Sequence, residues 1–222
     1  MDLDTTRTKS GYENIIKNFE SGETDILVGT QMVTKGLDFN NVNLVGVFDA
    51  DRMMHFPDFR SYERAFQLIT QVSGRSGRRE KKGKVVIQSS SPTHPIFSFV
   101  INHDVSGFIQ TQLHDRQEHF YPPYSRLIEI IVKYLDKKVV TEAAARFTEE
   151  IKKKNKQVRV LGPGEPMISK IRNEFLMSVL IKIGRDQGKL AEIKTELYNL
   201  AENLKGLKEY RNVKFIFDVD PA

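Results

Sequence analysis

The sequence predicts a mixed α/β protein in two parts, a lobe with a mostly parallel sheet followed by a smaller α+β domain. Strand-like and helix-like segments alternate in the first part, as in α/β folds with a parallel sheet. Two turn-rich segments, 89–95 and 121–124, then break the pattern. Beyond them the expected order is β-α-β-β-β-α-β, which is related to the split βαβ layout. We therefore expect domains at 1–93 and 125–222, joined by a helical linker at 94–124.

The first part contains short apolar runs and amphipathic segments. Asp58 or Ser61 is expected to cap the helix that leads to Val72. The apolar runs suit buried strands of a parallel sheet. The expected helices lie at 10–19, at 61–72 and, with an interruption near Gly107, at 96–119, and the expected strands lie at 26–28, 43–48 and 85–88.

The second part shows strand-like patterns in five of its segments, with alternation at 127–135, and helical spacing in two others. Tyr121-Pro122-Pro123-Tyr124 cannot lie inside a helix and marks its start. The expected strands are 127–135, 158–161, 167–171, 175–183 and 213–219, and the expected helices contain Val140 to Ile151 and Ile193 to Leu204.

The composition is that of a soluble globular protein. The chain has 222 residues, of which 39% are hydrophobic and 28% charged. It has no cysteine, which removes disulfides and thiolate metal sites. No apolar run approaches the roughly 20 residues that span a bilayer, and no signal peptide pattern opens the chain. The net charge of +5 modestly favours contact with nucleic acid.

The most informative stretch runs from Gln71 to Arg78 and reads Q-V-S-G-R-S-G-R. Its two arginines, Arg75 and Arg78, lie three positions apart. A guanidinium group binds phosphate oxygens in a bidentate manner and stays charged at physiological pH. Such a group stabilises the charge that develops on a transferring γ-phosphoryl group. The stretch therefore predicts a nucleotide contact.

The sequence contains no phosphate-binding loop of the form G-x-x-x-x-G-K-[ST]. The nearest approach, Gly188-Lys189-Leu190, lacks the first glycine at the right spacing and the Ser or Thr that binds magnesium. We therefore expect the chain to carry half of an ATP site and to be a fragment of a larger protein.

A second candidate site follows the apolar run at 26–28. Residues 29–39 read G-T-Q-M-V-T-K-G-L-D-F, and such a loop directly after a strand is where an open α/β sheet places its ligands. Thr30 and Lys35 suit contact with a nucleic-acid phosphate, and Asp38 suits contact with a ribose hydroxyl. Taken alone the loop would be structural, but its place ahead of the arginine stretch favours a function.

These segments, taken in order, closely resemble the PriA-type replication-restart helicases (primosomal protein N′), which belong to superfamily two. The likeness covers nearly the whole chain. It is carried by Asp2-Leu3-Asp4-Thr5-Thr6, the 29–39 loop, Asp49-Ala50-Asp51, Asp58-Phe59-Arg60-Ser61, the Gln71–Arg78 stretch, His94-Pro95, Pro122-Pro123, Leu161-Gly162-Pro163 and Asp218-Val219-Asp220-Pro221.

The resemblance implies most of a partial RecA-like second helicase lobe, followed by the family's C-terminal domain. The intact protein would be an ATP-dependent 3′→5′ DNA helicase that recognises stalled forks and reloads the replication machinery. ATP and Mg²⁺ would be its cofactors, with zinc only in a cysteine-ligated insertion upstream and no metal in this chain. The implied partners are forked and single-stranded DNA, single-strand-binding protein and other primosome proteins, in the bacterial cytoplasm at the nucleoid and not at a membrane.

The resemblance also implies roles for individual residues. Arg75 and Arg78 match the catalytic, nucleotide-sensing arginines. Leu37-Asp38 stands where many relatives have two histidines, so the contact of Asp38 stays open. The implied nucleotide contacts are Gln71, Gly74, Arg75, Arg78, Gly36 and Asp38, and the implied DNA contacts are Thr30, Gln31 and Lys35.

Simpler interpretations compete with several of these. Asp49 and Asp51 suit a turn at a strand end as well as a role in coupling. Tyr121 and Tyr124 suit base stacking, but more often such residues fix a linker. The basic loop Arg79–Lys84 is as readily solvated as bound to phosphate, and the lysines at 152–154 suit the negative end of a helix dipole.

Lys170, Arg172 and Arg185 lie near glycine-containing turns and are candidates for a pocket that docks DNA or an acidic peptide tail. If only this surface acts, the chain is a binding module for single-stranded DNA or single-strand-binding protein. That alternative and the helicase are compatible in a full protein. The chain alone is expected to be inactive as an ATPase.

Overall fold

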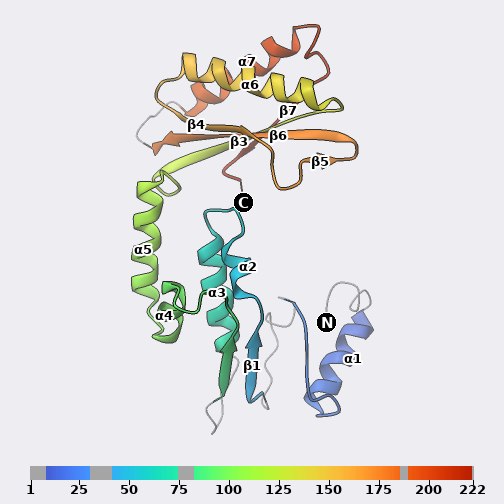
Figure 1. Ribbon diagram of the computed structural model, residues 1–222, viewed down its shortest axis with the longest axis vertical. Coiled ribbons are helices and arrows are strands. Elements are labelled where there is room, and N and C mark those ends of the chain that lie inside the picture. Colours follow the sequence, from blue (N-terminus) through green and yellow to red (C-terminus); the bar gives the residue numbers. More distant parts are fainter. Residues whose placement is uncertain (1–8, 31–41, 75–82, 186–189, 222) are drawn as a thin grey trace. The chain divides into compact units, whose positions relative to one another are not determined.

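Residues 1–112 form one unit of the chain and residues 113–222 form another (Figure 1). The computed structural model describes the residues 9–30, 42–74, 83–185 and 190–221. The domain boundaries expected from the sequence stay a prediction.

In the first unit helices precede and follow each of the strands β1 and β2 (Figure 1). Its elements are α1 (Lys9–Glu20), β1 (Leu44–Val47), α2 (Ala50–Met54), α3 (Ser61–Ser73), β2 (Lys84–Ile87), α4 (Pro95–Ile101) and the start of α5 (Val105–Glu118).

Strands β1 and β2 pair in parallel, with Leu44 opposite Lys84 and Val47 opposite Ile87. Val47 and Ile87 pack against a cluster of buried side chains from the helices. The parallel pair confirms the sheet expected at 43–48 and 85–88. The buried members of this cluster, called the first core, are Ala50, Met54, Ala65, Phe66, Ile69, Ile96, Phe97, Val100 and Phe108.

The strand expected at 26–28 is not present, because this segment belongs to no helix or strand. Ile26 and Val28 are exposed, and Leu27 is half-buried. An apolar run becomes a strand only where a neighbouring strand takes up its backbone N–H and C=O groups. A short apolar run alone is therefore not enough to predict a strand.

Two expected details of the helices were also wrong. Neither Asp58 nor Ser61 caps α3, because the N-cap residue is Arg60 and no side chain makes a capping hydrogen bond. Asp58 instead fixes the turn before α3 by accepting a hydrogen bond from the Arg60 backbone N–H (2.8 Å). The helical segment is interrupted at 102–104 and not at Gly107. Gly107 lies in the first turn of α5, where its N–H donates to Asp104 Oδ1 (2.9 Å).

The second unit has the order β-α-β-β-β-α-β that the sequence predicts. Met167 lies outside the strands, since the expected strand at 167–171 is limited to its last two residues. The elements are β3 (Ser125–Tyr134), α6 (Lys137–Lys154), β4 (Arg159–Gly164), β5 (Lys170–Ile171), β6 (Glu174–Gly184), α7 (Leu190–Lys205) and β7 (Lys214–Val219).

The strands of this unit form an antiparallel sheet in the order β4-β6-β3-β7, with β5 paired to β6. Helices α6 and α7 lie on one face of the sheet (Figure 1). The chain is therefore mixed α/β, with a parallel strand pair in the first unit and an antiparallel sheet in the second.

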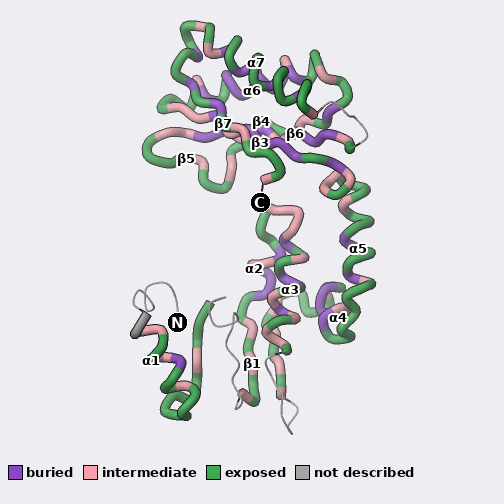
Figure 2. The backbone as a smooth tube through the Cα atoms, turned by 180° about the vertical axis from the view of Figure 1, so that it is seen from behind, coloured by how far each residue is buried: buried purple, intermediate pink, exposed green. Residues whose placement is uncertain are grey.

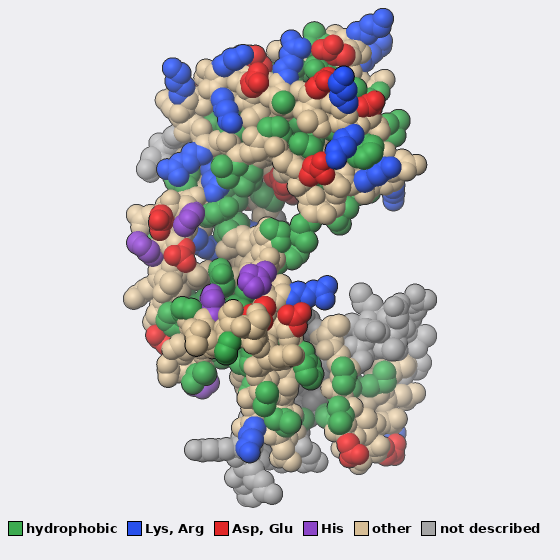
Figure 3. Space-filling model, viewed as in Figure 1, with side chains coloured by type: hydrophobic (Ala, Val, Ile, Leu, Met, Phe, Trp, Pro, Cys, Tyr) green, Lys and Arg blue, Asp and Glu red, His purple; other side chains and the backbone are tan. Residues whose placement is uncertain are grey.

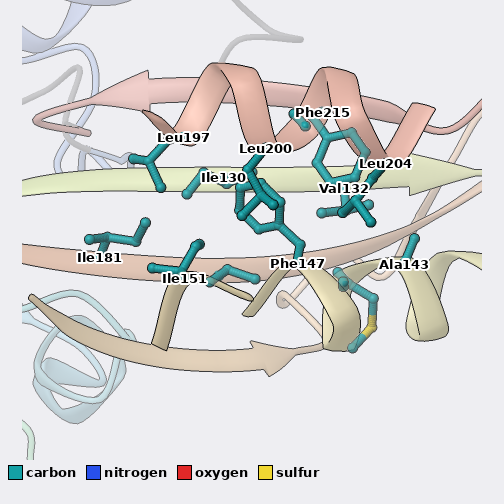
Figure 4. Packing of buried hydrophobic residues seen from close by; sticks show 14 of the residues in the cluster. Ile130, Val132, Ala143, Phe147, Ile151, Ile181, Leu197, Leu200, Leu204 and Phe215 are labelled. Carbon is teal, nitrogen blue, oxygen red and sulfur yellow. The ribbon is translucent and has the colours of Figure 1, made fainter. Parts of the chain in front are cut away.

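Sequence periodicity accounts for the core of the second unit. Asp136 caps α6 by accepting from the N–H groups of Lys138 (2.8 Å) and Val139 (3.2 Å). Val140, Ala144, Phe147 and Ile151 follow at helical spacing and are all buried. Phe147 packs toward the sheet among the side chains of Ile130, Val132, Ile181 and Phe215 and of Leu197, Leu200 and Leu204 from α7 (Figure 4).

Candidate functional site

The two parallel strands end side by side, and the chain after them is tied together by hydrogen bonds. The Ala50 backbone N–H donates to the Gln88 carbonyl oxygen (3.1 Å). The buried carboxylate of Asp51 accepts from the Ser90 backbone N–H (2.7 Å) and from the Ser89 hydroxyl (2.8 Å). The hydrogen bonds from Ser90 and Ser89 hold the pKa of Asp51 below its usual range. These contacts support the structural interpretation of Asp51, which holds the start of α2 against the end of β2.

Helix α3 carries the first half of the arginine stretch. Ala65, Phe66 and Ile69 anchor this helix in the first core, while Gln71 is exposed near its end. Gly74 follows as the C-cap residue, with φ −69° and ψ −3°, and its N–H donates to the Thr70 carbonyl oxygen (3.0 Å). A methyl group on Gly74 would lie 3.6 Å from the backbone oxygens of Gln71 and Thr70, an ordinary contact. The backbone at Gly74 therefore does not itself require glycine.

Most of the predicted nucleotide and DNA contacts lie outside the described residues. Thr30 is described and is exposed. The predictions for Arg75, Arg78, Gly36, Asp38, Gln31 and Lys35 concern residues outside the described ranges.

A cavity of about 410 Å³ lies beside the end of α3. Its walls are mainly apolar side chains of β2 and α4, including Val85, Ile87, Phe97 and Val100. Ser73 is the member of α3 that reaches it. The cavity is lined by neither Gln71 nor Gly74, so among the described residues it does not coincide with the predicted nucleotide contacts.

The three cations predicted to share a docking pocket do not lie together. Lys170 and Arg172 lie at the β5–β6 turn, where the Lys170 ammonium is 4.7 Å from the centre of the Phe175 ring. Arg185 directly follows the other end of β6, a strand of 11 residues. An extended strand of that length spans about 35 Å. One pocket cannot hold all three side chains.

Sequence analysis missed Lys182, which is only 4% exposed. Its ammonium donates to the His119 carbonyl oxygen (2.8 Å) and lies 3.2 Å from the centre of the Tyr121 ring. Burial, with a smaller effect from the nearby Arg159 charge, lowers the pKa of Lys182 to about 8. Because side chains alternate along β6, Lys182 lies on the face of the sheet opposite α6 and α7. Only the fold brings it to His119, which is 63 positions away in the sequence.

Tyr121 and its neighbours fix the connection that leads into β3. The Tyr121 N–H donates to the Arg116 carbonyl oxygen (2.8 Å), and Arg116 Nη1 donates to the Pro122 carbonyl oxygen (2.9 Å). The Arg159 guanidinium lies 4.5 Å from the centre of the Phe120 ring. For Tyr121 these contacts support the structural interpretation over base stacking.

Charge on the helical face of the second unit is mixed. Figure 3 shows Lys and Arg side chains interspersed with Asp and Glu over α6 and α7. Lys152, Lys153 and Lys154 occupy the last turn of α6, and Lys153 pairs with Glu150 (3.3 Å). This arrangement fits stabilisation of the helix end.

The described residues contain neither a candidate metal site nor a candidate membrane span. No group of three or more His, Cys, Asp or Glu side chains there is arranged to hold a metal ion. No helix in those ranges is long and apolar enough to cross a membrane.

Comparison with known proteins identifies both parts of the chain. Residues 2–80 match the family of the helicase conserved C-terminal domain, and residues 117–222 match that of the primosomal protein N C-terminal domain. Strand β1 and the arginine stretch lie within the first match, and the antiparallel sheet lies within the second.

Several similar curated proteins share the name replication restart protein PriA. The chain is 37% identical to that of Bacillus subtilis over all 222 of its residues, 42% identical to that of Synechocystis over 184 residues, and 36% identical to that of Chlamydia pneumoniae over 222 residues. It spans 27%, 22% and 29% of the lengths of these relatives. Over its whole length the chain is therefore similar to part of the proteins named replication restart protein PriA.

Proposed function

We propose that this chain serves as the nucleotide-sensing half-lobe and C-terminal domain of an ATP-dependent 3′→5′ DNA helicase that restarts stalled replication forks. The observation that carries the proposal is the presence, in one chain and in order, of a helicase C-terminal domain and a primosomal protein N C-terminal domain. The names of the similar curated proteins support it. A lobe of this kind acts on a nucleotide held by a second lobe.

In this proposal ATP binds between two lobes, with Mg²⁺ on its phosphates. Bound ATP supplies a γ-phosphoryl group whose developing charge the guanidinium groups of Arg75 and Arg78 stabilise. The exposed positions of Gln71 and Gly74 at the end of α3 suit an approach by the nucleotide. Gly36 and Asp38 complete the nucleotide contacts, and Thr30, Gln31 and Lys35 contact the DNA backbone.

The finer organisation is also a proposal. We assign residues 1–93 to a partial RecA-like lobe, 94–124 to a helical linker and 125–222 to a split-βαβ domain. The strand order β4-β6-β3-β7, with both helices on one face, supports the last assignment.

The proposed partners and location follow the family. We assign DNA, single-strand-binding protein and other primosome proteins as partners, with Lys170, Arg172 and Arg185 as docking residues on separate surfaces. The location would be the bacterial cytoplasm at the nucleoid, and zinc would bind in a part of the protein other than these residues.

The test measures DNA-stimulated ATP hydrolysis by a protein that contains this chain together with the nucleotide-binding lobe. Arg75→Ala or Arg78→Ala should lower the rate by about a thousandfold, since each removes a cation from the transferring phosphoryl group. Arg211→Ala, an exposed arginine of the second unit, is the control. The 222-residue chain by itself should show no turnover. Unchanged hydrolysis in the Arg75 and Arg78 variants would refute the proposal.

Gly74→Ala provides a complementary variant. Because Gly74 has a right-handed helical conformation with room for a methyl group, the fold should be unaffected or stabilised by about 0.5 kcal/mol. A fall in ATP hydrolysis with unchanged thermal unfolding would then report a lost contact at this surface.

A further inference from the structure

The segments that follow the carboxyl ends of the two parallel strands carry exposed aromatic rings. Phe56 and Tyr62 belong to the segment after β1, and they are 50% and 37% exposed. Figure 2 shows the connection between α2 and α3 as exposed or half-buried throughout. Open α/β sheets bind their ligands outside the carboxyl ends of their strands. The two rings therefore lie where a sheet of this type places a ligand.

Local contacts fix these rings in place. The Ser61 hydroxyl donates to the Phe56 carbonyl oxygen, which ties the backbone of residue 56 to the start of α3. The Tyr62 ring stacks on the ring of His94, which follows β2, with ring centres 5.3 Å apart and ring planes 10° apart. Residues from both strand ends thus contribute to one surface. We call Phe56, Tyr62 and His94 the aromatic platform.

The charges around the aromatic platform allow a nucleic acid to approach. Arg52, an exposed cation of the same segment, suits contact with a phosphate. Asp58 is paired with Arg64 (2.9 Å), and the carboxylate of Asp51 is buried and hydrogen-bonded. Aromatic faces bind every type of base, because every base has a π-face. The surface therefore combines a place for bases with a cation for their backbone.

The aromatic platform is separate from the proposed nucleotide contacts. Tyr62 lies in the first turn of α3, whereas Gln71 and Gly74 lie at the other end of this helix. Gly74 lies 12 positions after Tyr62, which corresponds to about 18 Å along a helix. A base on the platform therefore belongs to a ligand other than the ATP that those residues contact.

We propose that the aromatic platform stacks bases of a DNA single strand. Phe56 and Tyr62 would each take the face of a base, and Arg52 would contact a phosphate of the same strand. His94 would act as a positioning residue, because its ring supports the Tyr62 ring. The inference rests on the proposed function in taking DNA as the ligand. It adds contacts with bases to the proposed contacts with the DNA backbone.

The first test is photocrosslinking of the 222-residue chain to an oligothymidylate that contains 5-iodouridine, followed by mass spectrometry of the linked peptides. An iodinated base that stacks on the platform should link to Phe56 or Tyr62. In a parallel experiment 8-azido-ATP should label neither residue, which distinguishes a base of DNA from the base of ATP.

Fluorescence anisotropy with a labelled oligothymidylate then measures the affinity across a salt series. Phe56→Ala and Tyr62→Ala should each weaken binding about tenfold. The slope of the logarithm of the affinity against that of the salt concentration should stay unchanged in both variants, because neither side chain contacts a phosphate. Arg52→Gln should instead reduce the slope by about one. Tyr198→Ala removes an exposed tyrosine of α7 and is the matched control that should change neither quantity.

His94→Asn separates positioning of the Tyr62 ring from folding. The Nδ1 atom of His94 caps α4 by accepting from the Ile96 N–H (3.3 Å). Asparagine can also accept this hydrogen bond, so thermal unfolding should stay unchanged. Because the ring that supports Tyr62 is lost, binding of the oligothymidylate should weaken about threefold.

Several results would overturn the inference. They are absence of DNA binding by the chain, a bound oligonucleotide that links to neither Phe56 nor Tyr62, an equal loss of affinity in Tyr198→Ala, and labelling of the platform by 8-azido-ATP instead of DNA. Hydrolysis of ATP by the Arg75 and Arg78 variants is a separate measurement. The proposed function therefore stands or falls on that measurement, whatever the platform binds.

Discussion

Lys182 is a buried cation that contacts a carbonyl oxygen and an aromatic face. The His119 carbonyl oxygen and the Tyr121 ring both favour the ammonium form, but loss of solvation outweighs them and lowers the pKa to about 8. The charged form is therefore less favourable in the folded protein than in the unfolded chain, where a lysine has a pKa of 10.5. The residue holds the entry to β3 at a cost in stability that depends on pH.

The direction in which the free energy of unfolding changes with pH is a testable prediction. Between pH 8 and pH 10.5 the unfolded chain binds the Lys182 proton and the folded protein does not, so the free energy of unfolding should rise with pH across this window. Lys182→Met removes the group, and the rise should be smaller. Urea unfolding followed by circular dichroism at pH 7.5 and at pH 9.5 measures the difference.

Lys194→Met is the control for this experiment, because Lys194 is an exposed lysine of α7. It should keep the pH dependence of the parent chain. Identical pH dependence in the parent chain and Lys182→Met would contradict the assignment of a lowered pKa to Lys182.

At the scale of elements, the start of α5 depends on one local pair. Asp104 accepts a hydrogen bond from the Gly107 N–H (2.9 Å), and a methyl group on Gly107 would lie 2.2 Å from Asp104 Oδ2. Glycine at this position thus makes room for the carboxylate that satisfies an N–H group at the helix start. The same residue that suggested a break in the helix helps to begin it.

This pairing predicts opposite signs for one substitution in two backgrounds. In the parent chain Gly107→Ala should destabilise by about 1 kcal/mol, because it displaces the Asp104 carboxylate and loses the cap. With Asp104→Ala already present, Gly107→Ala should stabilise by up to about 1 kcal/mol through helix propensity. A double-mutant cycle of thermal unfolding measures both changes. Additive effects would show that the carboxylate and the glycine are not coupled.

The sequence predicts elements well where the pattern is local and long. Helix α6 combines a capping aspartate with apolar residues at helical spacing, and the order of elements in the second unit was confirmed. The strand expected at 26–28 was wrong, because pairing depends on a partner that a short apolar run does not specify. The strand expected at 167–171 is shorter for the same reason, leaving Met167 and Ile168 exposed.

The same distinction between local and distant contacts decides which features of the candidate site could be predicted from the sequence. The order of the motifs identified the family from sequence alone. The three docking cations looked like one pocket because they are close in sequence to glycine turns, yet β6 separates Arg185 from Lys170 and Arg172. Lys182 gave no signal, since its contacts come from residues distant in the chain.

At the scale of the whole molecule, the two units have separate hydrophobic cores of unequal size. All buried members of the larger core lie between Ile128 and Phe215, and those of the first core lie between Ala50 and Phe108. The larger core fills the space between an antiparallel sheet and two helices (Figure 4). Among the described residues of the first unit, Leu44, Phe48 and Val86 are exposed on or beside the parallel pair of β1 and β2. Parallel sheets are usually covered on both faces, so this part of the chain gains less from burial.

Because the first core is smaller than the core of the second unit, we expect the 222-residue chain to unfold in two steps, with the first unit unfolding earlier. Hydrogen exchange should protect the amides of β3 and β6 more strongly than those of β1 and β2, because a local opening costs less where fewer apolar groups are buried. Calorimetry should show two transitions. Phe147→Ala should lower the free energy of unfolding of the second by about 3–5 kcal/mol and leave that of the first unchanged. Ile69→Ala, in the first core, should affect only the first. A single transition that both substitutions shift together would show instead that the two cores unfold as one cooperative unit.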